Sequence, residues 1–486
     1  MHDPAEPAEP AGTSGSDPSA VPSGAATSVM DDLPAPLSHG LKQRHLTMLG
    51  LGGVIGAGLF VGSGAGIAVA GPGIVVSYLL AGALAMLIMR MLGEMSAAMP
   101  SSGAFSVHAE RALGRWAGFS VGWLYWFLLV VVLAVEATGA ARIAHGWAPA
   151  VPQWSWVLLF MVVFTAANLS AVKNFGEFEF WFAALKVGAI VLFLVLGLLA
   201  IVGWLPDTQP VGMANLTGQG GFLPNGWSGV VSGVLVVAFA FGGLEVVTIA
   251  AAESDDPVRN VARAVRSAVY RILFFYVGSM LVIVTLLPWT DIVPGESPYV
   301  AVLDHIGVPA AGQIMNVVVF VALLSALNAN LYGASRMVFS LAERGEAPKG
   351  LLKVTGGGVP RRALLASVAF GFVSVVLNLK WPDSVFLYLL NAVGAVLLFV
   401  WALIAVSELR LRRRIEHEAP ETLSLRMWCF PWLTWVALAA MAAVLVLMLL
   451  DDASRPQVLW SSGATALVLL VAGTRERVIR RTKRNY

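Results

Sequence analysis

Two long apolar segments of this chain are each interrupted by glycines near their midpoints. The first, from about 46 to 68, contains Gly53-Val54-Ile55-Gly56-Ala57-Gly58-Leu59-Phe60. The second, from about 229 to 252, contains Phe239-Ala240-Phe241-Gly242-Gly243-Leu244-Glu245. Hydrocarbon cannot hydrogen-bond a loose backbone, so irregular chain at membrane depth is tolerated only where it is buried in protein or lines a cavity. Two such breaks at corresponding positions in two halves of a chain indicate the binding site of a transporter.

The composition supports a membrane protein built from helices. Hydrophobic residues make up 58% of the 486 positions and charged residues 12%, whereas soluble domains contain roughly 25% charged residues. Apolar runs of about 20 residues are long enough to cross ~30 Å of hydrocarbon. We therefore expect an all-α integral membrane protein of about twelve transmembrane helices, near 46–68, 72–92, 116–143, 154–171, 179–203, 229–252, 269–288, 311–340, 363–379, 384–407, 431–450 and 457–473.

The basic residues predict the orientation. With the N-terminus in the cytoplasm, all but four of the 31 lysines and arginines fall in cytoplasmic loops, tails and adjoining helix ends. The exceptions are Arg142, Lys380 and Arg455 on the outside and Lys186 within a span. Because cytoplasmic loops carry an excess of Lys and Arg, we expect a multi-pass protein of the cell membrane with both termini in the cytoplasm.

The chain is expected to have one transporter core with flanking segments. Residues 1–38 are rich in Pro, Ala, Gly and Ser, and this composition predicts a disordered cytoplasmic tail. The core spans 39–410, helices 11 and 12 occupy 411–474, and 475–486 form a basic cytoplasmic tail. Helices 11 and 12 are expected to support packing or dimer contacts.

Two inverted repeats are expected within the core, at about 44–203 and 229–408. Each repeat contains five spans, an odd number, so the second must be upside down relative to the first. Both glycine breaks then fall in the first helix of their repeat. This is a 5+5 inverted repeat followed by two C-terminal helices.

The first break predicts an anion site made of backbone. Unwinding around Gly56, Ala57 and Gly58, with Val54 and Ile55 leading into it, exposes N–H groups at the start of a half-helix. These donors and the positive end of the helix dipole favour a carboxylate. The alternative is close helix packing, because Gly52/Gly56 and Gly58/Gly62 are small-xxx-small pairs.

The second break predicts the complementary half of the site. Carbonyls freed around Phe239, Ala240 and Phe241, next to Gly242, can accept hydrogen bonds from an ammonium group. Phe239 or Phe241 is also a candidate aromatic gate. Donors for a carboxylate and acceptors for an amine together fit a zwitterionic amino acid. The alternative is a flexible glycine kink.

Ionisable residues within the spans are costly and are therefore functional candidates. Lys186, partly removed from water, is a candidate for exchanging a proton during transport, or it snorkels to the interface. Glu245 either fixes the broken backbone or binds the amine. Glu136 is placed in an outer vestibule, and Glu253 in an inner gate or a solvated cluster.

Several motifs resemble those of the amino acid–polyamine–organocation superfamily. Gly-Val-Ile-Gly-Ala-Gly-Leu-Phe matches the superfamily signature. Within it, the bacterial amino acid transporter family is indicated by Leu41-Lys42-Gln43-Arg44-His45, Ala70-Gly71-Pro72, Arg90-Met91-Leu92-Gly93-Glu94-Met95 and Ser335-Arg336-Met337. Other stretches resemble GABA (4-aminobutyrate) permeases, among them Gly122-Trp123-Leu124-Tyr125-Trp126 and Val172-Lys173-Asn174-Phe175-Gly176-Glu177-Phe178-Glu179-Phe180-Trp181.

The resemblance implies a LeuT-like inverted-repeat fold, proton-coupled uptake, and a substrate held between the two breaks. It also matches Lys186 to the helix 5 lysine associated with proton coupling. We therefore expect a symporter that imports an amino acid, most directly GABA, by alternating access. The alternatives are a permease for α-amino acids (proline, asparagine, aromatic ones) and an amino acid or polyamine exchanger. We expect no enzymatic activity, cofactor, metal or nucleic-acid partner.

Overall fold

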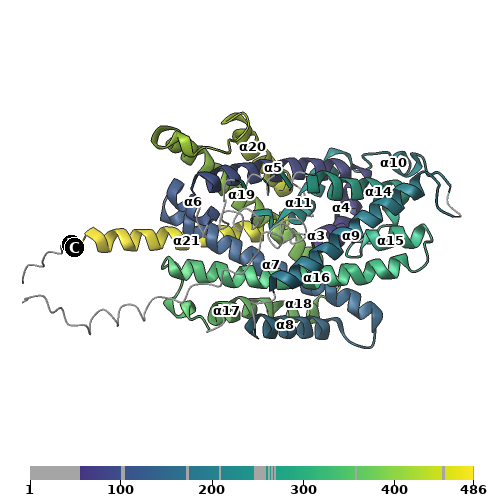
Figure 1. Ribbon diagram of the computed structural model, residues 1–486, viewed down its shortest axis with the longest axis horizontal. Coiled ribbons are helices and arrows are strands. Elements are labelled where there is room, and N and C mark those ends of the chain that lie inside the picture. The colour runs from purple at the N-terminus through teal and green to yellow at the C-terminus, as the bar shows by residue number, and fades with distance from the viewer. Residues whose placement is uncertain are drawn as a thin grey trace, which may run out of the picture. The chain divides into compact units, whose positions relative to one another are not determined.

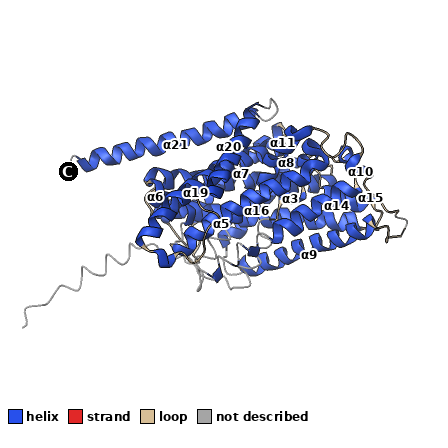
Figure 2. Cartoon of the chain, turned by 90° about the horizontal axis from the view of Figure 1, so that it is seen from above, coloured by secondary structure: helices blue, strands red, loops and turns tan. Residues whose placement is uncertain are grey.

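The computed structural model describes residues 55–99, 104–170, 175–206, 209–245, 259–260, 263, 266–267, 270–355, 358–450 and 455–484. Every regular element within these ranges is a helix (Figures 1 and 2). The predicted all-α class is thereby confirmed. The predicted tail at 1–38, together with Val54 and Glu253, lies outside the described residues.

The first half of the described chain runs from the start of the first break to the external loop before the second. Its elements are α3 (Ala57–Phe60), α4 (Gly62–Ala70), η1 (Gly71–Gly73), α5 (Ile74–Ala98), α6 (Ala104–Leu113), α7 (Arg115–Trp147), α8 (Gln153–Ser170), α9 (Phe175–Ile201) and α10 (Ala214–Thr217).

The second half begins with the second broken segment. Its elements are α11 (Gly226–Ala238), η2 (Phe239–Phe241), η3 (Ile272–Val277, a π-helix), α14 (Gly278–Leu286), η4 (Trp289–Asp291), α15 (Pro298–His305), α16 (Ala311–Glu343), η5 (Lys349–Leu352), α17 (Arg361–Gly371), α18 (Val373–Lys380), α19 (Val385–Glu418), η6 (Pro420–Thr422), α20 (Trp432–Leu450) and α21 (Arg455–Arg484). Helix α21 continues to Arg484, through the segment predicted as a basic tail.

Within the described residues, 8 helical stretches are long and apolar enough to cross a membrane. One of them, Gly62–Ala98, contains both α4 and α5, which are predicted as separate spans and meet at the Gly71-Pro72-Gly73 turn. Shorter apolar helices cover Gln153–Leu169, Gly226–Phe241 and Phe274–Leu286. The structure is thus a multi-span helical membrane protein, and the total of about twelve spans stays a prediction.

Helix α7 lies at the centre of the packing. Its most apolar 18-residue stretch is 89% buried, and the helix packs against α16, α19, α6 and α8. An α-helix that is apolar on all sides is one that is buried on all sides. In α20 and α21, only 22% of the most apolar 18-residue stretch of each helix is buried. These two helices therefore lie at the periphery of the described bundle.

Both predicted breaks are present. In the first segment the chain is non-helical at Ile55 and Gly56, α3 starts at Ala57, and Val61, with φ −123° and ψ −44°, interrupts the helix before α4. In the second segment the helix ends at Phe241, Gly242 is extended with ψ 139°, and Gly243 takes a positive φ of 94°. Positive φ is readily adopted only by glycine, so the turn depends on that residue.

The two breaks touch through their backbones. A Cβ atom added to Gly58 would lie 2.7 Å from Cα of Ala240 and 2.9 Å from Cδ1 of Phe239. Because the nearest obstacle is backbone, a rotamer change cannot relieve the overlap. The absence of a side chain at Gly58 therefore lets the two broken segments meet.

Gly58→Ala is expected to separate the breaks and reduce transport strongly, at a stability cost of about 1–3 kcal/mol for overpacking. Gly188→Ala is the matched control, because an added Cβ there meets no atom within 4 Å and alanine is the better helix former. Uptake rate in proteoliposomes and thermal unfolding in detergent measure the two effects. Equal uptake by the two variants would contradict the contact described here.

Candidate functional site

Glu136 of α7 binds the start of the first half-helix. The backbone N–H of Ala57 lies 3.1 Å from each carboxylate oxygen of Glu136, and Glu136 is 3% exposed. The first N–H groups of a helix have no partner within the helix, and a carboxylate is favourable there. Gly56 leaves room for this contact, since a Cβ at Gly56 would lie 2.5 Å from Glu136 Oε1. The carboxylate is therefore buried against the first break, and its role in an outer vestibule stays a prediction.

Lys186 of α9 is buried next to an acidic partner. Its Nζ atom lies 3.8 Å from Oε1 of Glu179, and both side chains are fully buried. The hydroxyl of Ser325, on α16, donates to the Glu179 carboxylate at 3.0 Å from each oxygen. Lys186 thus points into the protein and does not snorkel. The sequence analysis missed Glu179, although seven residues are about two helical turns and place both side chains on one face of α9.

Lys186 lies within electrostatic reach of both Glu179 and Glu136. When all three groups are ionised, they carry a net charge of −1 in a buried setting. Uncompensated charge is strongly disfavoured away from water, and one added proton makes the set neutral. Glu136, which binds the start of the first half-helix, thus belongs to this buried cluster of charged groups.

Glu245 supports the second break from within. Its carboxylate accepts a hydrogen bond from the N–H of Gly243 at 2.9 Å and a second from the indole N–H of Trp401 on α19. The hydroxyl of Tyr125, on α7, lies 3.5 Å from the same carboxylate. The sequence leaves two roles open for Glu245, fixing the broken backbone or binding the substrate amine. These contacts are of the first kind.

Aromatic rings surround the second break. Phe241 is fully buried and stacks on Tyr276 with ring centroids 5.1 Å apart. It also meets Tyr78 edge-on at 6.0 Å. The hydroxyl of Tyr276 donates to the carbonyl of Ala240 at 3.1 Å, so one predicted acceptor for the substrate amine already receives a hydrogen bond. Phe241 is a packed core residue here, as is Phe239, which is 6% exposed.

The arrangement brings most of the predicted residues to one region. Ala57 contacts Glu136, Gly58 contacts Ala240, and Glu245 closes the turn after Gly242. Ile55, just before the first half-helix, is completely buried. Sequence reasoning missed Tyr125 and Trp401. For Trp401 one signal was available, because a tryptophan buried in an apolar helix requires a partner for its N–H group.

A helical membrane bundle whose two interrupted segments meet beside buried ionisable groups is the architecture of a secondary transporter. The chain matches the amino acid permease family over residues 45–484, and it belongs to that family. The resemblance found in the motifs is confirmed.

Similar proteins carry two kinds of names. Over 434 residues the chain is 50% identical to the gamma-aminobutyric acid permease of Bacillus subtilis (strain 168), covering 89% of this chain and 92% of the relative. It is 49% identical over 426 residues to an aromatic amino acid transport protein of Corynebacterium glutamicum, covering 87% and 92%. The gamma-aminobutyric acid permease of Escherichia coli (strain K12) is 45% identical over 440 residues, covering 90% and 94%.

Trp401→Phe is expected to destabilise the protein by about 1.5–3 kcal/mol, because it removes a hydrogen bond to a buried carboxylate. The control is Trp435→Phe on α20, whose side chain is 55% exposed. Thermal unfolding in detergent compares the two variants, and an uptake assay reports on the second break. If Trp401→Phe matched Trp435→Phe in both measurements, Glu245 would not depend on this donor.

Proposed function

We propose that this protein imports a zwitterionic amino acid together with a proton, by alternating access. The observation that carries the proposal is the hydrogen bond that the N–H of Ala57 donates to the carboxylate of Glu136. A carboxylate bound there supports a second carboxylate, that of the substrate, as a ligand for this backbone position. In the proposed cycle, the substrate carboxylate takes the place of Glu136 at Ala57 while the second break, across the Gly58–Ala240 contact, receives the amine.

The cluster of Glu136, Glu179 and Lys186 links the proton to the substrate. A proton on Glu136 removes the negative charge that holds Ala57, which frees the backbone donor for a substrate carboxylate. Lys186, near both carboxylates, sets which of them is protonated. One charge crossing 100 mV gains about 2.3 kcal/mol and each pH unit about 1.4 kcal/mol. A sum of roughly 4 kcal/mol supports on the order of a thousandfold accumulation.

GABA is the substrate we favour, since two relatives at 50% and 45% identity, each covering about nine tenths of this chain, are named gamma-aminobutyric acid permeases. An aromatic amino acid is the second candidate because of the 49% identical relative from Corynebacterium glutamicum. The two substrates differ in geometry: GABA separates its amine and carboxylate by three methylenes, whereas an α-amino acid joins both groups to one carbon.

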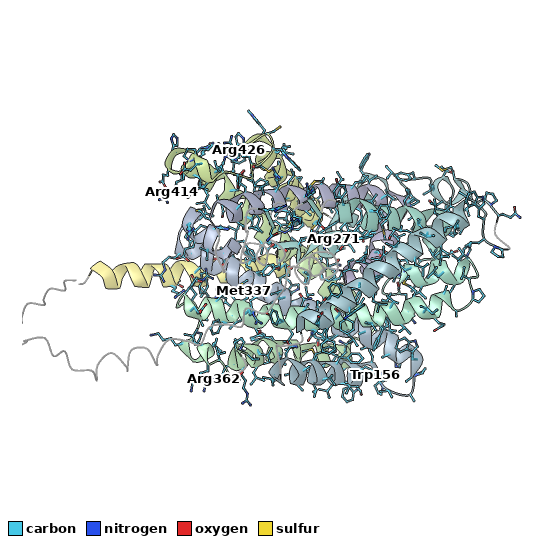
Figure 3. All side chains as sticks on the ribbon, viewed as in Figure 1. Trp156, Arg271, Met337, Arg362, Arg414 and Arg426 are labelled. Carbon is cyan, nitrogen blue, oxygen red and sulfur yellow. The ribbon has the colours of Figure 1, made fainter. Side chains whose placement is uncertain are left out.

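We place both termini in the cytoplasm of a cell membrane. The distribution of basic residues supports this orientation. In Figure 3, Arg362, Arg414 and Arg426 lie toward the end of the helix bundle at which α21 ends, and this clustering supports that end as the cytoplasmic one.

Lys186→Met is expected to abolish concentrative, proton-driven uptake while leaving exchange of substrate across the membrane. The methionine fills a similar volume but cannot balance Glu179 and Glu136. Proteoliposomes with an imposed pH gradient measure uptake, and counterflow without a gradient measures exchange. Lys380→Met, at an exposed lysine, is the control. Undiminished proton-dependent accumulation by Lys186→Met would remove Lys186 from the coupling mechanism.

A competition panel against labelled GABA uptake identifies the substrate class. Unlabelled GABA is expected to compete at least about tenfold better than phenylalanine, tryptophan, proline or asparagine, a difference of about 1.4 kcal/mol in binding. Stronger competition by phenylalanine or tryptophan would favour the aromatic candidate.

A further inference from the structure

Arg271 is a buried cation whose charge is not matched by a described partner. It lies immediately before η3 and is 2% exposed. Among the residues that the structure describes, none forms a hydrogen bond with Nε, Nη1 or Nη2 of its guanidinium. A guanidinium removed from water is strongly unfavourable without an anionic partner, and its planar donors match the oxygens of a phosphate.

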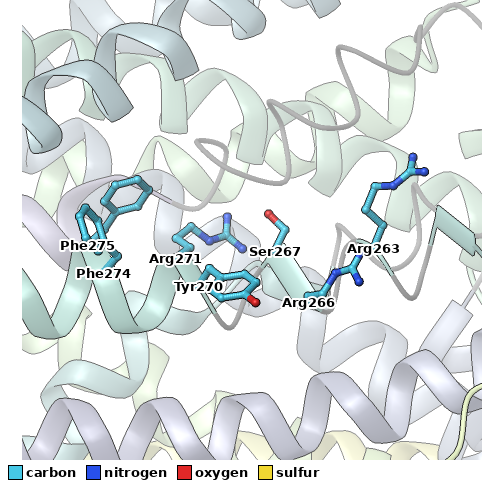
Figure 4. A pocket seen from close by; sticks show the side chains of 7 residues that line it. All are labelled: Arg263, Arg266, Ser267, Tyr270, Arg271, Phe274 and Phe275. Carbon is cyan, nitrogen blue, oxygen red and sulfur yellow. The ribbon is translucent and has the colours of Figure 1, made fainter.

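Arg271 is one of the residues that line a pocket of about 390 Å³, and the nitrogens of its guanidinium are buried. Figure 4 shows the guanidinium directed toward the hydroxyl of Ser267. Arg263 and Arg266 add positive charge, and no acidic side chain is among the lining residues that the structure describes: Arg263, Arg266, Ser267, Tyr270, Arg271, Phe274 and Phe275. Arg263 donates to the amide oxygen of Asn260 at 3.3 Å, which leaves its charge unneutralised by that contact. The pocket therefore offers donors and positive charge to an anion.

The pocket also has an apolar rim. Tyr270 is 69% exposed and Phe274 is 63% exposed. The helical segment from Arg271 to Leu286, where α14 ends, rises by at most about 24 Å. This length covers most of the ~30 Å hydrocarbon thickness. Arg271 is thus near the boundary that the basic residues assign to the cytoplasm, where exposed aromatic rings are typical of the interface. An anion with an attached acyl chain fits both parts of this pocket.

We propose that this pocket binds the phosphate group of an anionic phospholipid. The phosphate oxygens accept hydrogen bonds from Arg271 and Ser267, Arg263 and Arg266 supply further positive charge, and the glycerol and acyl region packs on Tyr270 and Phe274. Free inorganic phosphate shares the same chemistry and is the other source that the experiment must separate. This site is independent of the proposed amino acid transport.

The test uses the full chain in phosphatidylcholine nanodiscs, alone, with added phosphatidylglycerol, or with added inorganic phosphate. Native mass spectrometry measures which lipid is retained, and thermal unfolding measures stabilisation. Arg271→Gln is expected to lower retention of phosphatidylglycerol about tenfold, the effect of losing one charge-assisted pair. Arg361→Gln, at an exposed arginine that begins α17, is expected to retain the lipid as the unchanged protein does.

A second readout separates binding from structural damage. In phosphatidylcholine alone, Arg271→Gln is expected to unfold at the same temperature as the unchanged protein or higher, because it removes a buried charge that has no hydrogen-bond partner among the described residues. Only the increment from phosphatidylglycerol is lost. If Arg271→Gln does not fold, the Ser267→Ala/Arg266→Gln double variant decides by the same loss of lipid retention.

Phosphatidylglycerol-dependent stabilisation that Arg271→Gln removes supports the lipid as the ligand. Stabilisation by inorganic phosphate alone, also removed by Arg271→Gln, supports the phosphate site and assigns it a soluble ligand. Unchanged lipid retention in Arg271→Gln overturns the proposal. If Arg271→Gln does not fold, unchanged lipid retention in the double variant overturns it.

Discussion

A peptide group that leaves a helix inside a membrane must find a hydrogen-bond partner within the protein, and this structure meets that constraint with side chains from distant helices. Glu136 of α7 accepts from Ala57, Glu245 accepts from Gly243, and Tyr276 donates to Ala240. The interrupted segments are thereby held in defined positions. Without these partners, the same glycines would give only flexible kinks.

Two of the three supports are carboxylates, so the shape of the breaks depends on ionisation. Glu136 belongs to the same electrostatic cluster as Glu179 and Lys186, and under the proposed function one proton on Glu136 would release Ala57. Glu245 accepts hydrogen bonds from Trp401 and from the N–H of Gly243, so its described contacts support the second break.

The sequence predicted the features that depend on local pattern. The all-α class, most helix positions and both breaks follow from apolar run length and from Gly56, Gly58, Gly242 and Gly243. It did not predict the partners, because the pairing of Glu136 with Ala57 depends on how α7 is rotated against α3, and hydropathy does not report rotation. Glu179 is intermediate: its spacing from Lys186 was visible, but its burial was not.

The contact between Gly58 and Ala240 brings main chain of one broken segment against main chain of the other, with the ring of Phe239 beside it. Under the proposed function, peptide groups, which are alike whatever the residue, would recognise the shared carboxylate and amine of amino acids without distinguishing between amino acids. Selectivity must then come from the surrounding walls, which can change while the centre is kept. Relatives that share half of this sequence yet carry different substrate names are what such a division of labour produces.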